Sequence, residues 1–145
     1  MGTPALGATG PKRTEALRIY LAGYIDGEGC LSYRRGSITV AVDSIYPYTL
    51  RVFKKLYGGK ITKRQHRPGS RKRISYKWRI YSATAAVLLE DVLPYLREKK
   101  PQAILCLALR GTPPGPTRQG LEAQLKSLKH VEYDEEEEEE EHSAD

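Results

Sequence analysis

The sequence predicts an α+β domain that runs helix, β-hairpin, helix, β-hairpin and then further helices. Apolar residues repeat at helical spacing in residues 17–24 and 50–57, and they alternate with polar residues in residues 38–43 and 75–81. Glycine and proline punctuate the joints between these segments. At 145 residues the chain is long enough for one domain with a real core. We therefore expect one antiparallel sheet with helices on one face.

The first helix is expected to start after Thr14, whose hydroxyl can cap the free amides of a helix start. A bulky apolar stripe at helical spacing is expected to face the chain's own core: Leu17, Tyr20, Leu21 and Tyr24. A slimmer stripe lies on another side: Ala16, Ile19, Ala22 and Gly23. The thin side, with Ala22 and Gly23, would let a second helix approach closely.

Two acids, Asp26 and Glu28, lie at the carboxyl end of this helix. Gly27 and Gly29 are expected to stop the helix there, because glycine tolerates left-handed backbone angles. The helix dipole is unfavourable for anions at this end, so the carboxylates need compensation. A divalent cation could supply the positive charge that compensates these carboxylates.

Two hairpins and several helices are expected downstream. Strands are predicted at residues 30–35, 38–43, 60–66 and 72–81, with turns at Arg35-Gly36-Ser37 and at residues 67–71. Helices are predicted at residues 48–57, 83–93, 102–109 and 120–130; Pro47 opens the first, Gly58-Gly59 ends it, and Ser82 caps the second. Residues 111–116 are predicted to form a rigid linker.

The second hairpin predicts a sheet with one apolar and one cationic side. In its return strand Trp78 and Ile80 alternate with Lys77 and Arg79, and no acid occurs between Ser44 and Leu89. This pattern is expected of a sheet laid on a phosphate backbone, with side chains that reach base edges. An ordinary one-sided sheet also alternates, but it rarely excludes every acid from its wet side.

Strand parity selects the side chains that would read bases from the cationic side. A register error of one residue would flip a whole strand. The arginines among them could pair with guanine edges, while the lysines could touch phosphate. The candidates are Ser32, Arg34, Thr39, Asp43, Lys60, Thr62, Arg64, His66, Ser75, Lys77 and Arg79.

Positive and negative charges are separated along the chain. Of the 18 Asp and Glu, ten follow Val131, and eight of these are consecutive, whereas all 24 Lys and Arg precede residue 130. Residues 1–131 therefore combine 24 basic with 8 acidic residues, a net charge of +16. Such a body implies a polyanionic partner, with nucleic acid as the first candidate. The alternative, a solubilising surface, usually mixes both signs.

Both ends are expected to be disordered: residues 1–13 are rich in Gly, Pro and Thr, and residues 132–145 are acidic. The acidic segment could fold back on the basic body or serve as a passive solubilising tail. Residues 1–13 lack the apolar centre of a signal peptide, and no apolar run approaches the roughly 20 residues that cross a bilayer. Cys30 and Cys106 have no ligand spacing and fit reduced thiols. We expect an intracellular protein without a membrane partner.

The segment Leu21 to Gly29, with the sequence LAGYIDGEG, resembles the signature of the LAGLIDADG homing endonucleases at each of its nine positions. A second element, Leu93 to Ala103, is similar to the Pro-aromatic-Leu-basic-x-Lys-basic-x-Gln-Ala element of the single-motif members. The resemblance covers roughly residues 14–109. It implies an αββαββα fold whose saddle-shaped sheet lies over DNA. The expected organisation is an endonuclease core at residues 14–110, followed by a linker and helix at residues 111–131.

The resemblance also implies an activity: Mg²⁺-dependent, site-specific cleavage of double-stranded DNA by a homodimer, with Mn²⁺ able to substitute, in the service of intron or intein mobility. Glu28 corresponds to the metal-binding acid of the signature, and Gly27 would offer its backbone carbonyl. Lys99 matches the family's basic active-site residue, although a plain surface lysine is its alternative interpretation. Ala22 and Gly23 would lie in the dimer interface, and Asp26 is expected to tie the helix end.

Two other functions stay open. The chain could be a catalytically inactive binder with the same fold, either an intron maturase or a DNA-binding regulator. It could also be a general basic RNA-binding protein, which would leave the Gly-Glu-Gly turn and the thin helix side unexplained. The sequence contains no Cys/His metal spacing, Ser/His/Asp triad or phosphate-loop pattern.

Overall fold

The computed structural model describes residues 12–65, 68–69, 71 and 73–130. The strands are β1 (Gly29–Arg34), β2 (Ser37–Ser44), β3 (Lys60–Arg64) and β4 (Ser75–Tyr81). The helices are α1 (Glu15–Glu28), α2 (Tyr48–Tyr57), α3 (Ser82–Val92), α4 (Lys100–Arg110) and α5 (Pro116–Lys129), with a 3-10 turn, η2, at Leu93–Tyr95. His66 and the segments 1–11 and 131–145, for which expectations were stated, lie outside the described residues.

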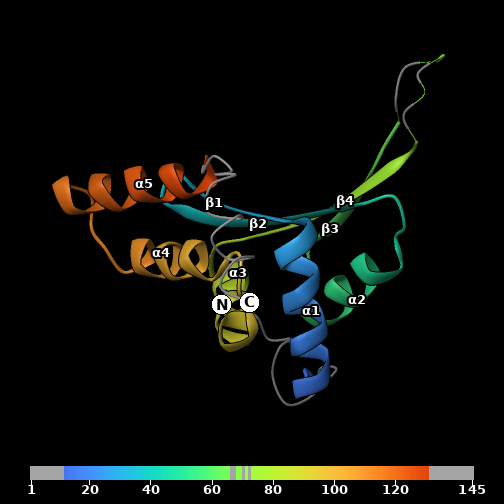
Figure 1. The fold of residues 1–145 in the computed structure, drawn as a ribbon, viewed down its shortest axis with the longest axis horizontal. Helices are drawn as coiled ribbons and strands as arrows, with labels where there is room; N and C mark the ends of the chain where they lie inside the picture. Colours follow the sequence, from blue (N-terminus) through green and yellow to red (C-terminus); the bar gives the residue numbers. More distant parts are fainter. Residues whose placement is uncertain (1–11, 66–67, 70, 72, 131–145) are drawn as a thin grey trace, which may run out of the picture.

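The strands form one antiparallel sheet in the order β1-β2-β4-β3, which confirms the predicted α+β architecture. Figure 1 shows α1, α2, α3 and α4 on one side of this sheet and α5 beside its β1 end. The register brings Val40 opposite Leu31 and Ile80, and Trp78 opposite Val42 and Ile61, so apolar side chains gather toward the helices. We call this side the inner face and the opposite side the outer face.

Trp78 lies at the centre of the core, where it is fully buried. Its ring stacks on Phe53 of α2 with centroids 4.7 Å apart, and its indole nitrogen donates to the Gly58 carbonyl at 2.8 Å. Gly59 follows with a φ of +89°, and a Cβ there would lie 2.5 Å from the Ile80 side chain. The predicted stop at Gly58-Gly59 is thus confirmed, because only glycine fits this turn against the sheet.

The predicted reason for the glycines at the end of α1 is wrong. The helix runs through Gly27 to Glu28, and Gly29 has an ordinary φ of −82°. A Cβ on Gly29 would instead lie 2.8 Å from the Ile25 carbonyl oxygen and 2.9 Å from the Ile25 side chain. Glycine is therefore required at position 29 by the close approach of the preceding turn, not by a left-handed backbone.

The two sides of α1 differ from the prediction at two positions. Ala22, placed on the thin side by its spacing, is fully buried in the chain's own core together with Leu21 and Ile25. Tyr20, expected in the core, is 53% exposed, and its hydroxyl shares a 2.8 Å hydrogen bond with Thr49 of α2. The buried side of α1 therefore includes Ala22 and excludes Tyr20, because the helix packs against α3, η2 and the sheet together.

Three further boundaries differ. Arg13, assigned to the disordered end, contacts Asp91 of α3 with an Nε–Oδ2 distance of 2.7 Å. Ser82 does not cap α3; it has a φ of +54°, and its hydroxyl shares a 2.7 Å hydrogen bond with Ser37. Helix α5 begins at Pro116, four residues before the predicted start, because proline is favourable in the first turn of a helix.

The two thiols lie in opposite environments: Cys30 is exposed on β1, and Cys106 is buried in α4. Burial raises the pKa of Cys106 to about 11. At pH 8 its thiolate fraction would be roughly a hundredfold below that of an ordinary thiol. We therefore expect a thiol-alkylating reagent at pH 8 to modify Cys30 only, with Cys106 reacting after denaturation. Mass spectrometry of peptides from native and denatured samples measures this, and equal labelling in the native state would contradict it.

Among the residues that the structure describes, no helix is both long and apolar enough to span a membrane.

Candidate active site and nucleic-acid interface

Asp26, near the end of α1, joins this helix to the segment that precedes α4. Its carboxylate accepts hydrogen bonds from the backbone amides of Arg97 at 2.9 Å and Lys99 at 3.0 Å. Charge-assisted bonds of this kind are stronger than neutral ones. Both carboxylate oxygens of Asp26 are thus engaged by backbone, as expected for an acid that ties the helix end.

The Lys99 side chain also forms a hydrogen bond with the carboxyl end of α1. Its ammonium group donates to the backbone carbonyl of Asp26 at 2.7 Å. This carbonyl is one of the last four of α1, which have no partner inside the helix. The half-buried Lys99 therefore holds a positive charge against the carboxyl end of the helix that carries Glu28.

Glu28 is the last residue of α1 and is exposed. No described residue forms a hydrogen bond or ion pair with its carboxylate. In the described ranges, no group of three or more His, Cys, Asp or Glu side chains could hold a metal ion. At this helix end one chain thus offers one carboxylate without a described partner, that of Glu28, together with the backbone carbonyl of Gly27. This donor set fits Mg²⁺ only in part, since Mg²⁺ prefers oxygen ligands but completes its shell with waters, further carboxylates or substrate phosphates.

One side of α1 is not covered by the described chain, and it extends from Glu28 toward the amino end of the helix. Its exposed residues are small or apolar: Ala16, Ile19, Tyr20, Gly23 and Gly27. No heavy atom would lie within 4 Å of a Cβ built on Gly23. We call these five residues the open stripe. Of the two residues predicted for the dimer interface, only Gly23 belongs to it, because Ala22 is buried within the chain.

The outer face carries the strand residues predicted to read bases. The register aligns Lys60 with Arg79 and Thr62 with Lys77 across β3 and β4, and it aligns Ser32 with Thr39 across β1 and β2. Strand parity places the remaining candidates on the same face: Arg34, Asp43, Arg64 and Ser75. The described candidates therefore share the outer face, as strand parity predicts, and their contact with DNA stays a prediction.

Positive charge dominates the β3–β4 part of the outer face. A shallow recess of about 310 Å³ is lined there by Lys60, Arg64, Lys77 and Arg79, together with Thr62 and Tyr81. Lys77 also contacts Asp43, with an Nζ–Oδ2 distance of 3.8 Å. The sequence reasoning missed Tyr81, which is 53% exposed. The alternation that selected residues 75, 77 and 79 would have included it.

Comparisons with known proteins identify the fold. No family model and no curated protein matches the chain. Solved structures do match: the homing endonuclease I-CvuI with its target in the presence of Ca has a TM-score of 0.61 at 20% identity, over 81% of this chain and 85% of that one. I-CvuI with the I-CreI target in the presence of Mg, with the DNA not cleaved, has a TM-score of 0.59 at 20% identity, over 83% and 87%.

An archaeal intron-encoded homing endonuclease, I-Vdi141I, is also similar in its complex with DNA. Its TM-score is 0.59 at 15% identity, over 81% of this chain and 87% of that one. In all three cases the likeness covers more than four fifths of this chain and of the other chain. The chain therefore has the fold of the homing endonucleases, as its LAGLIDADG-like motif predicts.

Proposed function

We propose that the protein is a site-specific endonuclease that hydrolyses both strands of duplex DNA as a homodimer. The observation that carries the proposal is the free carboxylate of Glu28, at the end of a helix whose adjoining stripe is open. A carboxylate at the carboxyl end of a helix is unfavourable, and no described residue pairs with this one, so a bound divalent cation would stabilise it. The positive outer face on the same domain supplies a surface for the phosphate backbone.

We propose a homodimer because each chain has a single Glu28, whereas a DNA duplex has two strands to cleave. Two copies that pack along their open stripes about a two-fold axis would bring both Glu28 residues near that axis. Each copy would then place its outer face on one half of a long pseudo-palindromic site. The solved structures with this fold contain DNA, which supports the choice of partner.

The residues at the helix end have separate tasks in the proposed reaction. A divalent cation such as Mg²⁺, when bound, supplies charge neutralisation at the phosphate and a more acidic water. Glu28 and the Gly27 carbonyl would hold it. The Lys99 ammonium group binds the Asp26 carbonyl at the same helix end, and from there it would stabilise charge that develops during hydrolysis. Asp26 fixes the backbone of Lys99 and so positions its side chain.

Selection of cleaved sites from a random duplex library in the presence of Mg²⁺ tests the proposed function. We expect recovered sites to converge on one long sequence with approximate two-fold symmetry. Recovery of bound but uncut duplexes in both Mg²⁺ and Mn²⁺ would favour the inactive binder instead. Absence of any enriched duplex would reject sequence-specific DNA recognition altogether.

Replacement of Lys99 by alanine is expected to slow cleavage about a hundredfold, because charge stabilisation at the phosphate is lost. DNA affinity should change less than about threefold, since one of many cationic contacts is removed. Single-turnover cleavage and equilibrium binding of the selected site measure the two effects. Lys100→Ala, one residue further along α4, is the matched control and should retain near-normal cleavage. Equal losses in the two variants would contradict a specific role for Lys99.

A further inference from the structure

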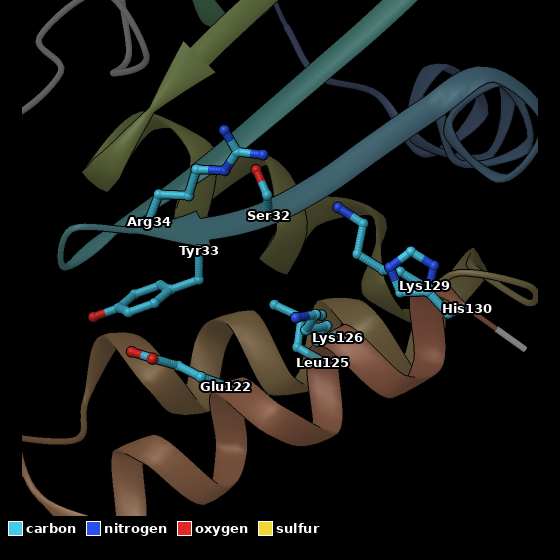
Figure 2. Close-up of a pocket in the computed structure, with 8 residues that line it drawn as sticks. All are labelled: Ser32, Tyr33, Arg34, Glu122, Leu125, Lys126, Lys129 and His130. Carbon is cyan, nitrogen blue, oxygen red and sulfur yellow. The ribbon is translucent and has the colours of Figure 1, made fainter.

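A second positive recess lies between β1 and α5, away from the end of α1. It has a volume of about 330 Å³ and is lined by Arg34 of β1 and by Lys126, Lys129 and His130 at the end of α5. Figure 2 shows Tyr33 directed toward α5, while Ser32 and Arg34 lie on the other side of the strand. We call this the β1–α5 recess.

The fixed charges of the recess leave it cationic. Glu122, the one acid among the described residues that line it, is paired with Arg118 one helical turn earlier, with an Oε1–Nε distance of 3.2 Å. The guanidinium of Arg118 also lies over the Tyr33 ring, 5.1 Å from its centroid. Lys126 and Lys129 line the recess from α5, and Arg34 lines it from the outer face of β1 (Figure 2). None of these three cations is paired with Glu122.

The recess is continuous with the outer face of the sheet. The Lys129 ammonium group lies 3.5 Å from the sulfur of Cys30, an outer-face residue of β1. An anionic chain that enters the recess could thus pass over β1 onto the cationic side chains of β4 and β3.

The chain itself leaves α5 at this recess. His130 lines it, and four residues later the sequence begins a run of eight consecutive acids, Asp134 to Glu141. We propose that this acidic segment binds the β1–α5 recess and the adjoining outer face of its own chain, in competition with DNA. The competition rests on the proposed function, whereas the contact within the chain does not.

The acidic segment is long enough for this contact. Residues 131–141 can span about 35 Å when extended. The sheet order places β3 three strand spacings from β1, a distance of roughly 14 Å. A segment tethered so closely has an effective concentration in the millimolar range, which makes even a weak ionic contact well populated. DNA phosphates would suit the same cations, but they have no such tether.

The contact within the chain is tested without DNA. Full-length protein is compared with a full-length variant in which Glu135 to Glu141 are all glutamine, at low salt, by NMR of the backbone amides. We expect the signals of Ser32, Arg34 and residues 126–130 to differ between the two proteins and to converge as salt is raised. Identical signals of Ser32 and Arg34 in the two proteins at low salt would overturn the proposal, whatever the protein does with DNA.

The competition is tested with a duplex that lacks the target site. The glutamine-tail variant should bind this DNA about tenfold more tightly at low salt than the natural chain does. The same comparison is made in a protein whose Lys126 and Lys129 are both glutamine. In that background, replacing the natural tail with the glutamine tail should change the affinity for DNA by less than about threefold. If the recess is instead a DNA-binding site, the two lysine replacements will weaken binding equally with either tail, and the proposal fails.

Discussion

Replacement of Glu28 by glutamine is expected to abolish DNA cleavage and to leave DNA binding intact. Glutamine keeps the size of the side chain but removes the charge that would hold a divalent cation at the end of α1. A bound cation contributes several kcal/mol to phosphoryl chemistry, so a loss of at least about a thousandfold in the cleavage rate is expected. Single-turnover assays on the selected site, with Mg²⁺ in excess, measure the rate.

Stability measurements separate this loss from misfolding. No described residue pairs with the Glu28 carboxylate, and the carboxyl end of a helix disfavours negative charge. The Glu28→Gln protein should therefore be as stable as the natural one, or more stable by about 0.5 kcal/mol. Glu90→Gln, an exposed acid on α3, is the matched control and should cut DNA normally. Cleavage by Glu28→Gln within tenfold of the natural rate would show that the active site lies elsewhere.

Replacement of Gly23 by glutamine is expected to separate the proposed dimer without destabilising the folded chain. A Cβ at position 23 meets nothing within 4 Å in the single chain, and glutamine favours a helix over glycine by about 0.5 kcal/mol. Across a two-fold axis the new side chain would clash twice, at about 1–3 kcal/mol each time. The association constant should therefore fall by roughly 30-fold to 20,000-fold. Sedimentation velocity measures this weakening, and the cleavage assay should show a parallel loss of activity.

Gly120→Gln is the matched control for the dimer experiment. Gly120 lies inside α5, and a Cβ there also meets nothing within 4 Å. Both variants gain the same helix propensity, so both should keep the helix content of the natural protein. Gly120→Gln should melt at or above the temperature of the natural protein, whereas Gly23→Gln loses the stabilisation that association provides. Only Gly23→Gln should become monomeric. A Gly23→Gln protein that stays dimeric and cuts DNA would place the interface on another surface.

Strand parity was the part of the site that the sequence predicted best. Period-two alternation determines which face a residue occupies once the apolar side is fixed, as it is by Trp78 and Ile80. The absence of acids from residues 45–88 then marked the other side as cationic. Both signals are local and repeat along a strand, so a single sequence is enough to detect them.

The surroundings of α1 were harder to predict. Helical spacing gives the angle of Ala22 around the axis, but it does not tell how wide an arc the neighbours cover. Likewise, glycine is needed at position 29 because the Ile25 carbonyl, one turn earlier, comes too close for a Cβ. In the sequence alone, a glycine required by such a contact looks the same as a glycine that ends a helix with a left-handed backbone. The recess at β1 depends on where α5 docks, and nothing in residues 116–130 specifies that position beyond an apolar stripe.

The paired bonds between Asp26 and Lys99 join two segments that are 73 residues apart in the sequence. Because each residue anchors the other, fraying of the chain before α4 would release the ammonium group and the helix end in one event. A substitution that breaks either bond should therefore displace both groups together, and activity should be lost in one step rather than in proportion to the number of bonds removed.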